Sequence, residues 1–286
     1  MCDAGTPASL GIRFQVEGRD YALEQCAGCG CAFSAPRPDD DLLRRVYTEG
    51  YDYSWFRDHL DAKLQDARQR VREYGPWLGS RVLDFGGGLG YFATAAREAG
   101  HESATLDPYV HGQAAAAQAD WDSVVALHVL EHSNDPLAML GGIRARLRPG
   151  GTLILAVPNY AGAGYRERGV HWVWAQPPIV HIFHFTARGL TRLLERGGFQ
   201  VEDIDFHERW DGNYVADVLE VERFRRLGAD WARRPWARFA PYRRYIAYRN
   251  SQLRFAAMER SLRDHPMDPA LRAELQVVAR RARDGA

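Results

Sequence analysis

The chain has 286 residues, of which 46% are hydrophobic, and its 37 basic side chains balance its 37 acidic ones. This composition supports one sizeable core with a small appendage. The N-terminus lacks a signal-peptide pattern, and no segment approaches the ~18 apolar residues of a membrane span, so we expect a cytoplasmic protein with no membrane partner.

The charges are unevenly distributed along the chain. Residues 221–286 contain 16 arginines and seven acidic residues, whereas the whole chain is neutral. Such a basic segment could face RNA, an anionic small substrate, or an acidic surface of the same protein or of a second copy. We favour the last, because amphipathic helical extensions are more often packing or dimer elements than nucleic-acid arms. Nucleic acid is therefore not the expected partner.

Residues 1–38 contain all four cysteines. The run Cys26-Ala-Gly-Cys29-Gly resembles one knuckle of a zinc ribbon. A structural zinc ion needs four ligands, and Cys2 is not followed three positions later by a second cysteine. We therefore favour a degenerate zinc-ribbon-like leader without metal, with Cys2, Cys26 and Cys29 as the candidate ligands if zinc is bound. Cys31 is expected to be a small buried hydrophobic residue.

Residues 39–76 are predicted to form a helical lid or linker. Asp39 or Asp40 can cap a helix that runs through Tyr47, and a longer helix is predicted over 56–74, ending before Gly75.

Residues 77–220 alternate between apolar strand patterns and amphipathic helix patterns. The predicted strands cover 81–85, 102–106, 123–128, 152–157 and 199–206, and the predicted helices cover 91–99, 136–147 and 186–197. This alternation specifies an α/β fold, a Rossmann-like, doubly wound, mostly parallel sheet with helices on both faces. Ligands of such sheets bind at the carboxyl ends of the strands.

Residues 221–286 are predicted to be an arginine-rich helical extension. One helix is predicted over 241–263, and Asp268-Pro269 is typical of the N-cap and first turn of a last helix. A homodimer formed through these helices is one expected use of the segment.

A glycine-rich run follows the strand predicted at 81–85. Gly86, Gly88 and Gly90 allow a sharp turn and a close approach to a ligand, and Asp84 lies at the end of the strand. A dinucleotide-binding fingerprint would need a glycine where Tyr91 stands, and a phosphate-binding loop would need Gly-Lys-Ser or Gly-Lys-Thr. The remaining pattern, D-x-G-x-G-x-G, predicts a nucleoside site in which the carboxylate of Asp84 can accept from an amine or a hydroxyl but would repel a phosphate.

The second strand closes with Asp107-Pro108. In nucleoside-binding α/β sheets, a carboxylate at the end of this strand accepts hydrogen bonds from both ribose hydroxyls. Asp107 is therefore the predicted ribose ligand.

Together, these motifs resemble those of class I S-adenosylmethionine-dependent methyltransferases, and more closely the methyltransferase type 23-like members, many of which carry a zinc-ribbon leader. The run Trp121 to Pro136 also resembles the fourth-strand motif of the branch that includes ubiquinone-biosynthesis O-methyltransferases. The resemblance implies S-adenosyl-L-methionine as the cofactor. The implied cofactor-binding residues are Asp84, Phe85, Gly86, Gly88, Gly90, Asp107, Pro108, Leu127 and His128.

One region departs from the family pattern. Only 14 residues separate Asp107 from Asp122, so we expect the usual helix to be absent and the third strand to be shortened or lost. The adenine pocket is normally built there, and Asp120 and Trp121 are its remaining candidates.

The fourth-strand motif contains the letters H-x-x-E-H, from His128 to His132. A zinc-protease site with this pattern requires a helix, and an apolar strand pattern precedes it here, so we reject that interpretation. The ubiquinone branch has E-x-x-E-H at this position and can use a divalent ion. His128 replaces the first carboxylate and disfavours Mg²⁺, so we predict no metal at this motif.

Methyl transfer to oxygen needs an aligned acceptor and a base. The segment His181-Ile-Phe-His184-Phe-Thr resembles the family's motif before its substrate-side helix, which makes His181 the first choice for the base and His184 an alternative, with His132 as a third. The candidates for contact with the acceptor are Tyr51, Tyr53, Asn159, Tyr160 and Trp172.

We therefore predict a methyltransferase that acts on a small-molecule acceptor, with O-methylation in sugar or secondary (natural product) metabolism as the preferred role. Two alternatives stay open: an RNA-directed methyltransferase that uses the basic C-terminal helices, and a family member that binds S-adenosylmethionine without methylating.

Overall fold

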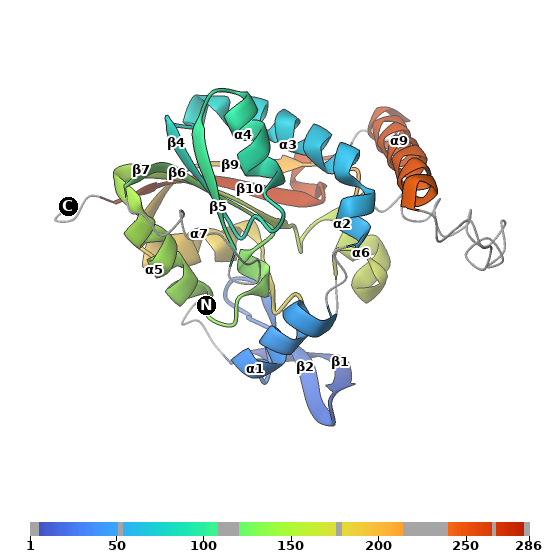
Figure 1. The fold of residues 1–286 in the computed structure, drawn as a ribbon. Coiled ribbons are helices and arrows are strands. Elements are labelled where there is room, and N and C mark those ends of the chain that lie inside the picture. The colour runs from blue at the N-terminus through green and yellow to red at the C-terminus, as the bar shows by residue number, and fades with distance from the viewer. Residues whose placement is uncertain are drawn as a thin grey trace.

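A six-stranded sheet forms the centre of the molecule (Figure 1). The computed structural model describes residues 6–50, 54–107, 120–175, 179–213, 240–264 and 267–282. The strand order is β5-β4-β6-β7-β10-β9. The bounds are β4 Arg81–Phe85, β5 Glu102–Leu106, β6 Trp121–Leu127, β7 Leu147–Pro158, β9 Phe199–His207 and β10 Glu274–Arg281. The first four strands in this order run parallel, whereas β10 is antiparallel to both of its neighbours. The predicted Rossmann-like α/β fold is confirmed.

Helices cover both faces of this sheet because successive strand residues point to opposite sides. In β6, Val124 packs with α5 (Pro136–Arg146) and α7 (Ala187–Arg196). The next residue, Val125, packs on the other side with α3 (Leu60–Tyr74) and α4 (Tyr91–Glu98). Figure 1 shows the two helical layers with the sheet between them.

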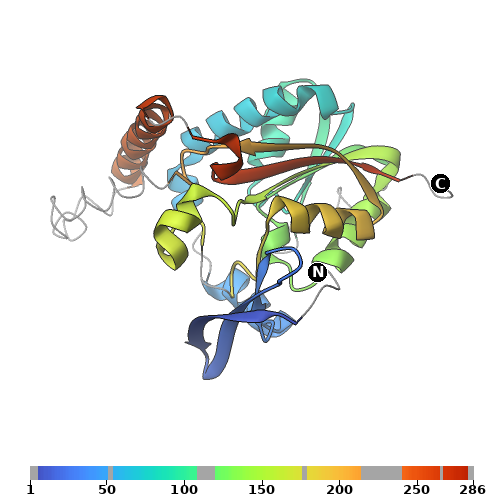
Figure 2. The same cartoon turned by 180° about the vertical axis from the view of Figure 1, so that it is seen from behind.

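The segment after Asp268-Pro269, which was predicted to be a last helix, forms a strand. Asp268 caps only a single 3₁₀ turn, Pro269–Leu271, and the chain then enters β10 instead of a helix. The first six residues of β10 are buried, because this strand lies inside the sheet between β7 and β9 (Figure 2). An apolar run this short does not distinguish a helix from a strand by periodicity. Therefore only part of the basic C-terminal segment is helical, and its end belongs to the core.

The other predicted C-terminal helix is present as α9 (Ala240–Asp264), which contacts α2 (Ser54–Asp58) and α3. It exposes Tyr245, Tyr248 and Leu253. Dimerisation through this helix stays a prediction. Within the described residues, no helix combines the length and apolar character needed to cross a bilayer.

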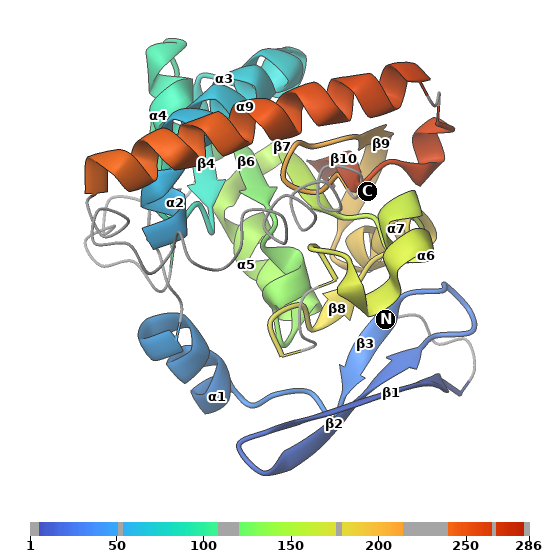
Figure 3. The ribbon, with the colours of Figure 1, turned by 90° about the vertical axis from the view of Figure 1, so that its right-hand side faces the viewer.

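The N-terminal segment forms a second, smaller sheet (Figure 3). Its antiparallel strands are β1 (Ala8–Val16), β2 (Arg19–Gln25), β3 (Ala32–Ala35) and β8 (Phe183–His184). Because β8 comes from the histidine-rich segment far along the sequence, the leader is anchored to the core domain.

The turn between β2 and β3 contains Cys26, Cys29 and Cys31, which are all buried. Cys31 Sγ accepts a hydrogen bond from Thr186 N at 3.3 Å. Gly189 leaves room for it, since a Cβ there would lie 2.0 Å from this sulfur. No cysteine belongs to a metal-ligating group among the described residues, and Cys2 lies outside them, so the zinc question stays a prediction.

The segment before the core is helical, as expected, but it is divided. Asp39 caps α1 (Asp40–Arg45) by accepting from Leu42 N at 2.8 Å, and a π-helical turn (Val46–Gly50) follows. The helix predicted at 56–74 is split at His59 into α2 and α3. A further helix, α6 (Ala163–Arg168), and a 3₁₀ turn (Gly169–His171) occupy part of the long loop after β7.

A buried carboxylate joins three of these elements. Glu274, at the start of β10, is fully buried. It accepts two hydrogen bonds from Arg70 of α3 at 3.0 and 2.6 Å, and one from Arg209, which follows β9, at 2.9 Å. His128, after β6, donates to it through Nε2 at 2.9 Å. Both arginines hold the pKa of Glu274 well below its usual range despite its burial, so the group is a carboxylate.

Removal of this charge should destabilise the fold strongly. We expect Glu274→Gln to lower the free energy of unfolding by about 3–5 kcal/mol, because Arg70 and Arg209 each lose a fully buried counter-charge and keep only the less buried carboxylates of Asp66 and Glu73. Urea denaturation measures the change. The matched control is Glu202→Gln, which removes a partly exposed ion pair with Arg280 and should cost less than about 1 kcal/mol. Equal effects of the two substitutions would contradict this account of the network.

Candidate active site

The predicted glycine turn lies at the carboxyl end of β4. Gly86, Gly88 and Gly90 all have positive φ angles, of 70°, 53° and 74°. A Cβ on Gly86 would lie 2.6 Å from the side chain of Val129, and a Cβ on Gly87 would lie 2.1 Å from Asp84 Oδ2. At Gly88, in contrast, a Cβ would meet nothing within 4 Å. Gly86 and Gly87 therefore leave no room for a side chain, whereas the space at Gly88 is open.

Asp84 lies beneath this turn. Its side chain is 2% exposed, and Oδ2 accepts a hydrogen bond from Ala93 N in α4 at 3.2 Å. Burial, together with the nearby charge of Asp107, raises the pKa of Asp84 to about 7. A cationic ligand above the turn would favour the ionised form.

Asp107 follows β5 and lies beside the same turn. Its Oδ2 accepts from Gly88 N at 2.9 Å, so the two predicted acidic ligands flank the glycine run. Phe85 ends β4 and is half-buried in the core. Pro108, the next predicted cofactor residue, lies outside the described residues, as does the rest of the shortened stretch as far as residue 119.

The adenine-pocket candidates Asp120 and Trp121 are wrong. Trp121 begins β6, so it lies at the amino end of the parallel strands, opposite the glycine turn. Its ring is 2% exposed and packs beneath the guanidinium of Arg81, at 4.9 Å. The sequence placed both residues near the pocket only because the preceding stretch is short.

Leu127 ends β6 and His128 follows it directly, so both lie at the strand end, as predicted. Leu127 packs against the cluster beneath α3 and α4. His128 has a φ of 55°, and its N–H donates to Ala156 O at 2.8 Å. Burial alone would lower the pKa of His128, but the carboxylates of Glu131 and Glu274 outweigh this effect and raise it to about 9. The imidazolium is therefore committed to these carboxylates, which sequence reasoning did not anticipate.

The three predicted base candidates lie together. The ring of His181 is 4.6 Å from that of His132 and 6.4 Å from that of His184, between centroids. Burial lowers the pKa of His184 to about 4, and burial with repulsion from its histidine neighbours lowers that of His181 well below its usual value. Both rings are therefore neutral at physiological pH.

Sequence reasoning missed one member of this group, Glu131. It lies in a 3₁₀ turn, Leu130–His132, that follows β6, and its side chain is 1% exposed. The turn is adjacent to the glycine run, since Val129 packs over Gly86. The fourth-strand motif already contained Glu131 next to His132, but only the fold brings His181 to the same place.

Two of the residues predicted to contact the acceptor, Asn159 and Trp172, are buried and bonded within the protein. Asn159 is fully buried, and its side-chain amide donates to Ala270 O and Arg272 O at 2.9 and 2.8 Å. Trp172 is 3% exposed and donates to Gly212 O. Both side chains anchor loops in this structure, because their polar atoms are used internally, so the expected contact with an acceptor is not supported by their positions.

Tyr160 is also largely buried. Its hydroxyl donates to that of Tyr165 at 3.0 Å, and its ring lies 5.4 Å from that of His184. It therefore borders the histidine group without opening into solvent. Tyr51 and Tyr53 lie outside the described residues.

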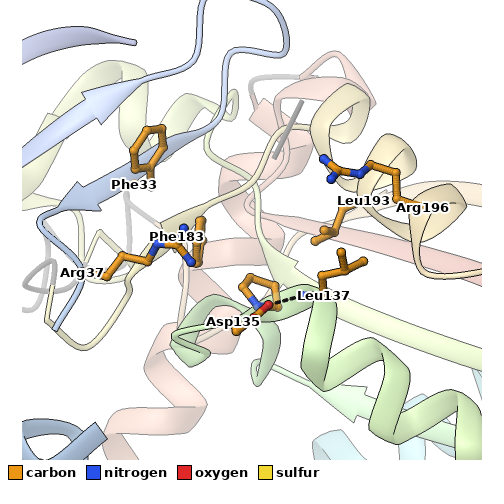
Figure 4. A pocket seen from close by; sticks show the side chains of 8 residues that line it. Phe33, Arg37, Asp135, Leu137, Phe183, Leu193 and Arg196 are labelled. Atoms are coloured by element: carbon orange, nitrogen blue, oxygen red, sulfur yellow. Dashed lines mark hydrogen bonds between the residues drawn. The ribbon is translucent and has the colours of Figure 1, made fainter. Parts of the chain in front are cut away.

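A cavity of about 250 Å³ lies between the small sheet and helices α5 and α7 (Figure 4). Phe33, Phe183 and Leu193 line it, and Arg37 stacks over Phe183 at 5.8 Å. None of its lining residues is a predicted site residue. Since adjacent strand residues point to opposite sides, Phe183 faces this cavity while His184 faces Tyr160.

Known proteins match the central part of this chain. Residues 56–204, slightly more than half of the chain, match the family model described as a methyltransferase domain. The chain is 30% identical over 172 residues to the ubiquinone biosynthesis O-methyltransferase of Dinoroseobacter shibae. The match covers 48% of this chain and 69% of that protein.

A second relative is the tRNA U34 carboxymethyltransferase of Dichelobacter nodosus, at 30% identity over 181 residues. That match covers 53% of this chain and only 54% of the relative's length. Among solved structures, the Burkholderia thailandensis 1,6-didemethyltoxoflavin-N1-methyltransferase superposes with a TM-score of 0.49 and 17% identity, over 94% of this chain and 99% of that one. An Archaeoglobus fulgidus S-adenosylmethionine-dependent methyltransferase gives a TM-score of 0.44 at 17% identity, over 85% and 100% of the chains.

The raised pKa of Asp84 predicts a pH-dependent stability. The ordinary value is 3.8 and the folded value is about 7, so the folded chain holds this proton more tightly than the unfolded chain does. The free energy of unfolding contributed by Asp84 therefore falls as the pH rises from about 4 to about 7. Asp84→Asn removes this loss, and its stability relative to the parent protein should rise by roughly 2 kcal/mol between pH ~5 and pH ~8.

Chemical denaturation at the two pH values, without ligand, measures this difference. The control is Asp203→Asn, at an exposed position of β9, which should show no such change. A difference between Asp84→Asn and the parent protein that is independent of pH would show that Asp84 is ionised throughout.

Proposed function

Since the chain belongs to the methyltransferase domain family and is a class I S-adenosylmethionine-dependent methyltransferase, we propose that it methylates an oxygen atom of a small molecule. The observation that carries the proposal is the gathering of His132, His181 and Glu131 next to the glycine turn. An oxygen acceptor must lose a proton during transfer, and this group offers proton acceptors close to the cofactor.

The residues around the turn fit the cofactor. The cradle at Gly88 is open, and Asp107 lies at the strand end where a carboxylate can accept from both ribose hydroxyls. Asp84 provides a buried carboxyl group whose ionisation a nearby cation would favour, which suits a ligand that carries an ammonium and a sulfonium. In the family that this chain resembles, the glycine turn faces the amino acid end of the cofactor.

The chemistry supplied by the bound cofactor is an electrophilic methyl group on a sulfonium. The protein's task is first to align the acceptor oxygen in line with the carbon–sulfur bond, which the walls of the site do by restricting its position. Transfer of this methyl group would leave the cofactor as a neutral thioether. The hydroxyl proton leaves toward the group formed by Glu131, His132 and His181, so a neutral ether is released.

One of the named relatives supports oxygen as the acceptor, since the Dinoroseobacter shibae protein is an O-methyltransferase. They give no particular support to sugar or natural product metabolism, which enters the proposal only as the setting that we favoured from the sequence. Cytoplasmic location and a small-molecule acceptor belong to the same proposal.

RNA is the second candidate acceptor, because one relative acts on tRNA and α9 exposes several arginines, among them Arg244 and Arg249. Fluorescence anisotropy with tRNA decides between the two. RNA is favoured if tRNA binding depends steeply on salt and if Arg244→Ala and Arg249→Ala weaken it. Our proposal expects no such binding.

The proposal itself is tested by incubating the protein with S-adenosylmethionine and a panel of phenols, catechols and hydroxylated sugars. Mass spectrometry should find an acceptor that gains one methyl group, together with S-adenosylhomocysteine. Turnover of the cofactor without methyl gain would identify the non-methylating alternative. A methylated nitrogen or carbon would contradict the assignment of oxygen.

Substitution of Asp107 should weaken cofactor binding selectively. We expect Asp107→Asn to raise the Kd for S-adenosylmethionine about 10–100-fold, because charge-assisted hydrogen bonds to the ribose are lost. Isothermal titration calorimetry measures Kd. The control is Asp120→Asn, at an exposed position on the opposite edge of the sheet, which should leave Kd unchanged. An unaltered Kd in Asp107→Asn would contradict the ribose assignment.

A further inference from the structure

Glu131, His132 and His181 form a compact group of three donors. One ligand atom from each lies within 4.8 Å of the others. Glu131 and His132 come from the turn after β6, whereas His181 comes from the segment before β8. Three donors from two separate segments, converging on one point at the site, are what a small cation requires.

The two histidines are already oriented for this purpose. His181 Nδ1 lies 2.9 Å from Trp174 O, and His132 Nδ1 lies 2.7 Å from Val180 O. A carbonyl oxygen can only accept, so each Nδ1 carries the proton and each Nε2 presents a lone pair. Metal-bound histidines are held in this way, with the second ring nitrogen donating to a backbone carbonyl.

Glu131 supplies the third donor. The side chain is 1% exposed, and neither carboxylate oxygen has a hydrogen-bond partner among the described residues. The facing groups are His128 Nδ1, 3.3 Å from Oε1 but without hydrogen-bond geometry, and His132 Nε2 at 4.0 Å. The His128 imidazolium offsets the charge of Glu131, but both carboxylate oxygens still lack hydrogen bonds, and a coordinated cation would use their lone pairs.

We propose that Glu131, His132 and His181 bind one divalent transition-metal ion of the zinc class. Two imidazoles and one carboxylate suit such an ion better than Mg²⁺, which prefers oxygen ligands. This ligand set differs from the H-x-x-E-H motif of the sequence. His128, the first residue of that motif, bonds to Glu274, and His181 is the third ligand. Three protein ligands leave a coordination position open.

The use of that position rests on the proposed function. An acceptor hydroxyl bound there would lose its proton more readily, because the cation stabilises the alkoxide or phenolate. With both histidines on the ion, the proton acceptor would be the second carboxylate oxygen of Glu131, since this residue offers only one oxygen as a ligand. Metal binding itself does not depend on the identity of the acceptor, so the two proposals can be tested separately.

The test is titration of the full-length, chelator-treated protein with Co²⁺. We expect one equivalent to bind and to produce visible absorption bands, and Zn²⁺ to displace it. His181→Ala and the isosteric Glu131→Gln should each weaken binding at least ~100-fold, since the loss of an outer-shell partner alone costs 10–100-fold. The matched control is His207→Gln, which removes a partly exposed histidine beside Asp205 and should bind Co²⁺ as the parent protein does.

Circular dichroism identifies any variant that fails to fold. If His181→Ala is unfolded, the isosteric Glu131→Gln still tests the metal site. Absence of stoichiometric binding, or full binding by a folded Glu131→Gln protein, would overturn the metal site. Methyl transfer that persists in a protein without bound metal would overturn the metal's role while leaving the proposed function intact. Stoichiometric Co²⁺ binding without methylation of any hydroxyl acceptor would support the metal site and contradict the proposed O-methylation.

Discussion

The geometry of the site depends on the buried carboxylate of Glu274. Because this side chain is fully buried, its charge must be neutralised locally, and Arg70, Arg209 and His128 provide the counter-charge. These partners come from α3, from the segment after β9 and from the end of β6. The interaction therefore fixes the position at which β6 turns toward Glu131, with His128 held at a positive φ. The C-terminal strand β10 thus supports the end of β6, next to which the proposed site lies.

Much of the fold followed from the sequence because periodicity reports burial directly. The strands β4, β5 and β6 lie within a few residues of the predicted ranges, since β4 leads directly into the glycine turn, β5 begins soon after Gly100, and β6 contains the buried apolar run from Val124 to Ala126. β10 was missed for a physical reason. Its apolar run is short, follows a valid helix N-cap and is flanked by arginines, and only its pairing with β7 and β9 makes it a strand.

The site divides in the same way. The turn around Gly86 and the carboxylate of Asp107 could be predicted, because backbone geometry and a strand end specify local residue types. The acceptor side could not, because it depends on contacts between distant segments. Asn159 looked like a pocket residue but bonds to the loop before β10, and Glu131 became significant only when His181 was found beside it.

The most direct measurement is a crystal structure of the full chain with S-adenosylhomocysteine. The account predicts that the ribose lies on Asp107, and that the face of the sulfur which would carry the methyl group points toward Glu131, His132 and His181. A cavity for the acceptor should connect the two. The account is contradicted if the sulfur faces away from this group, or if packed side chains separate them.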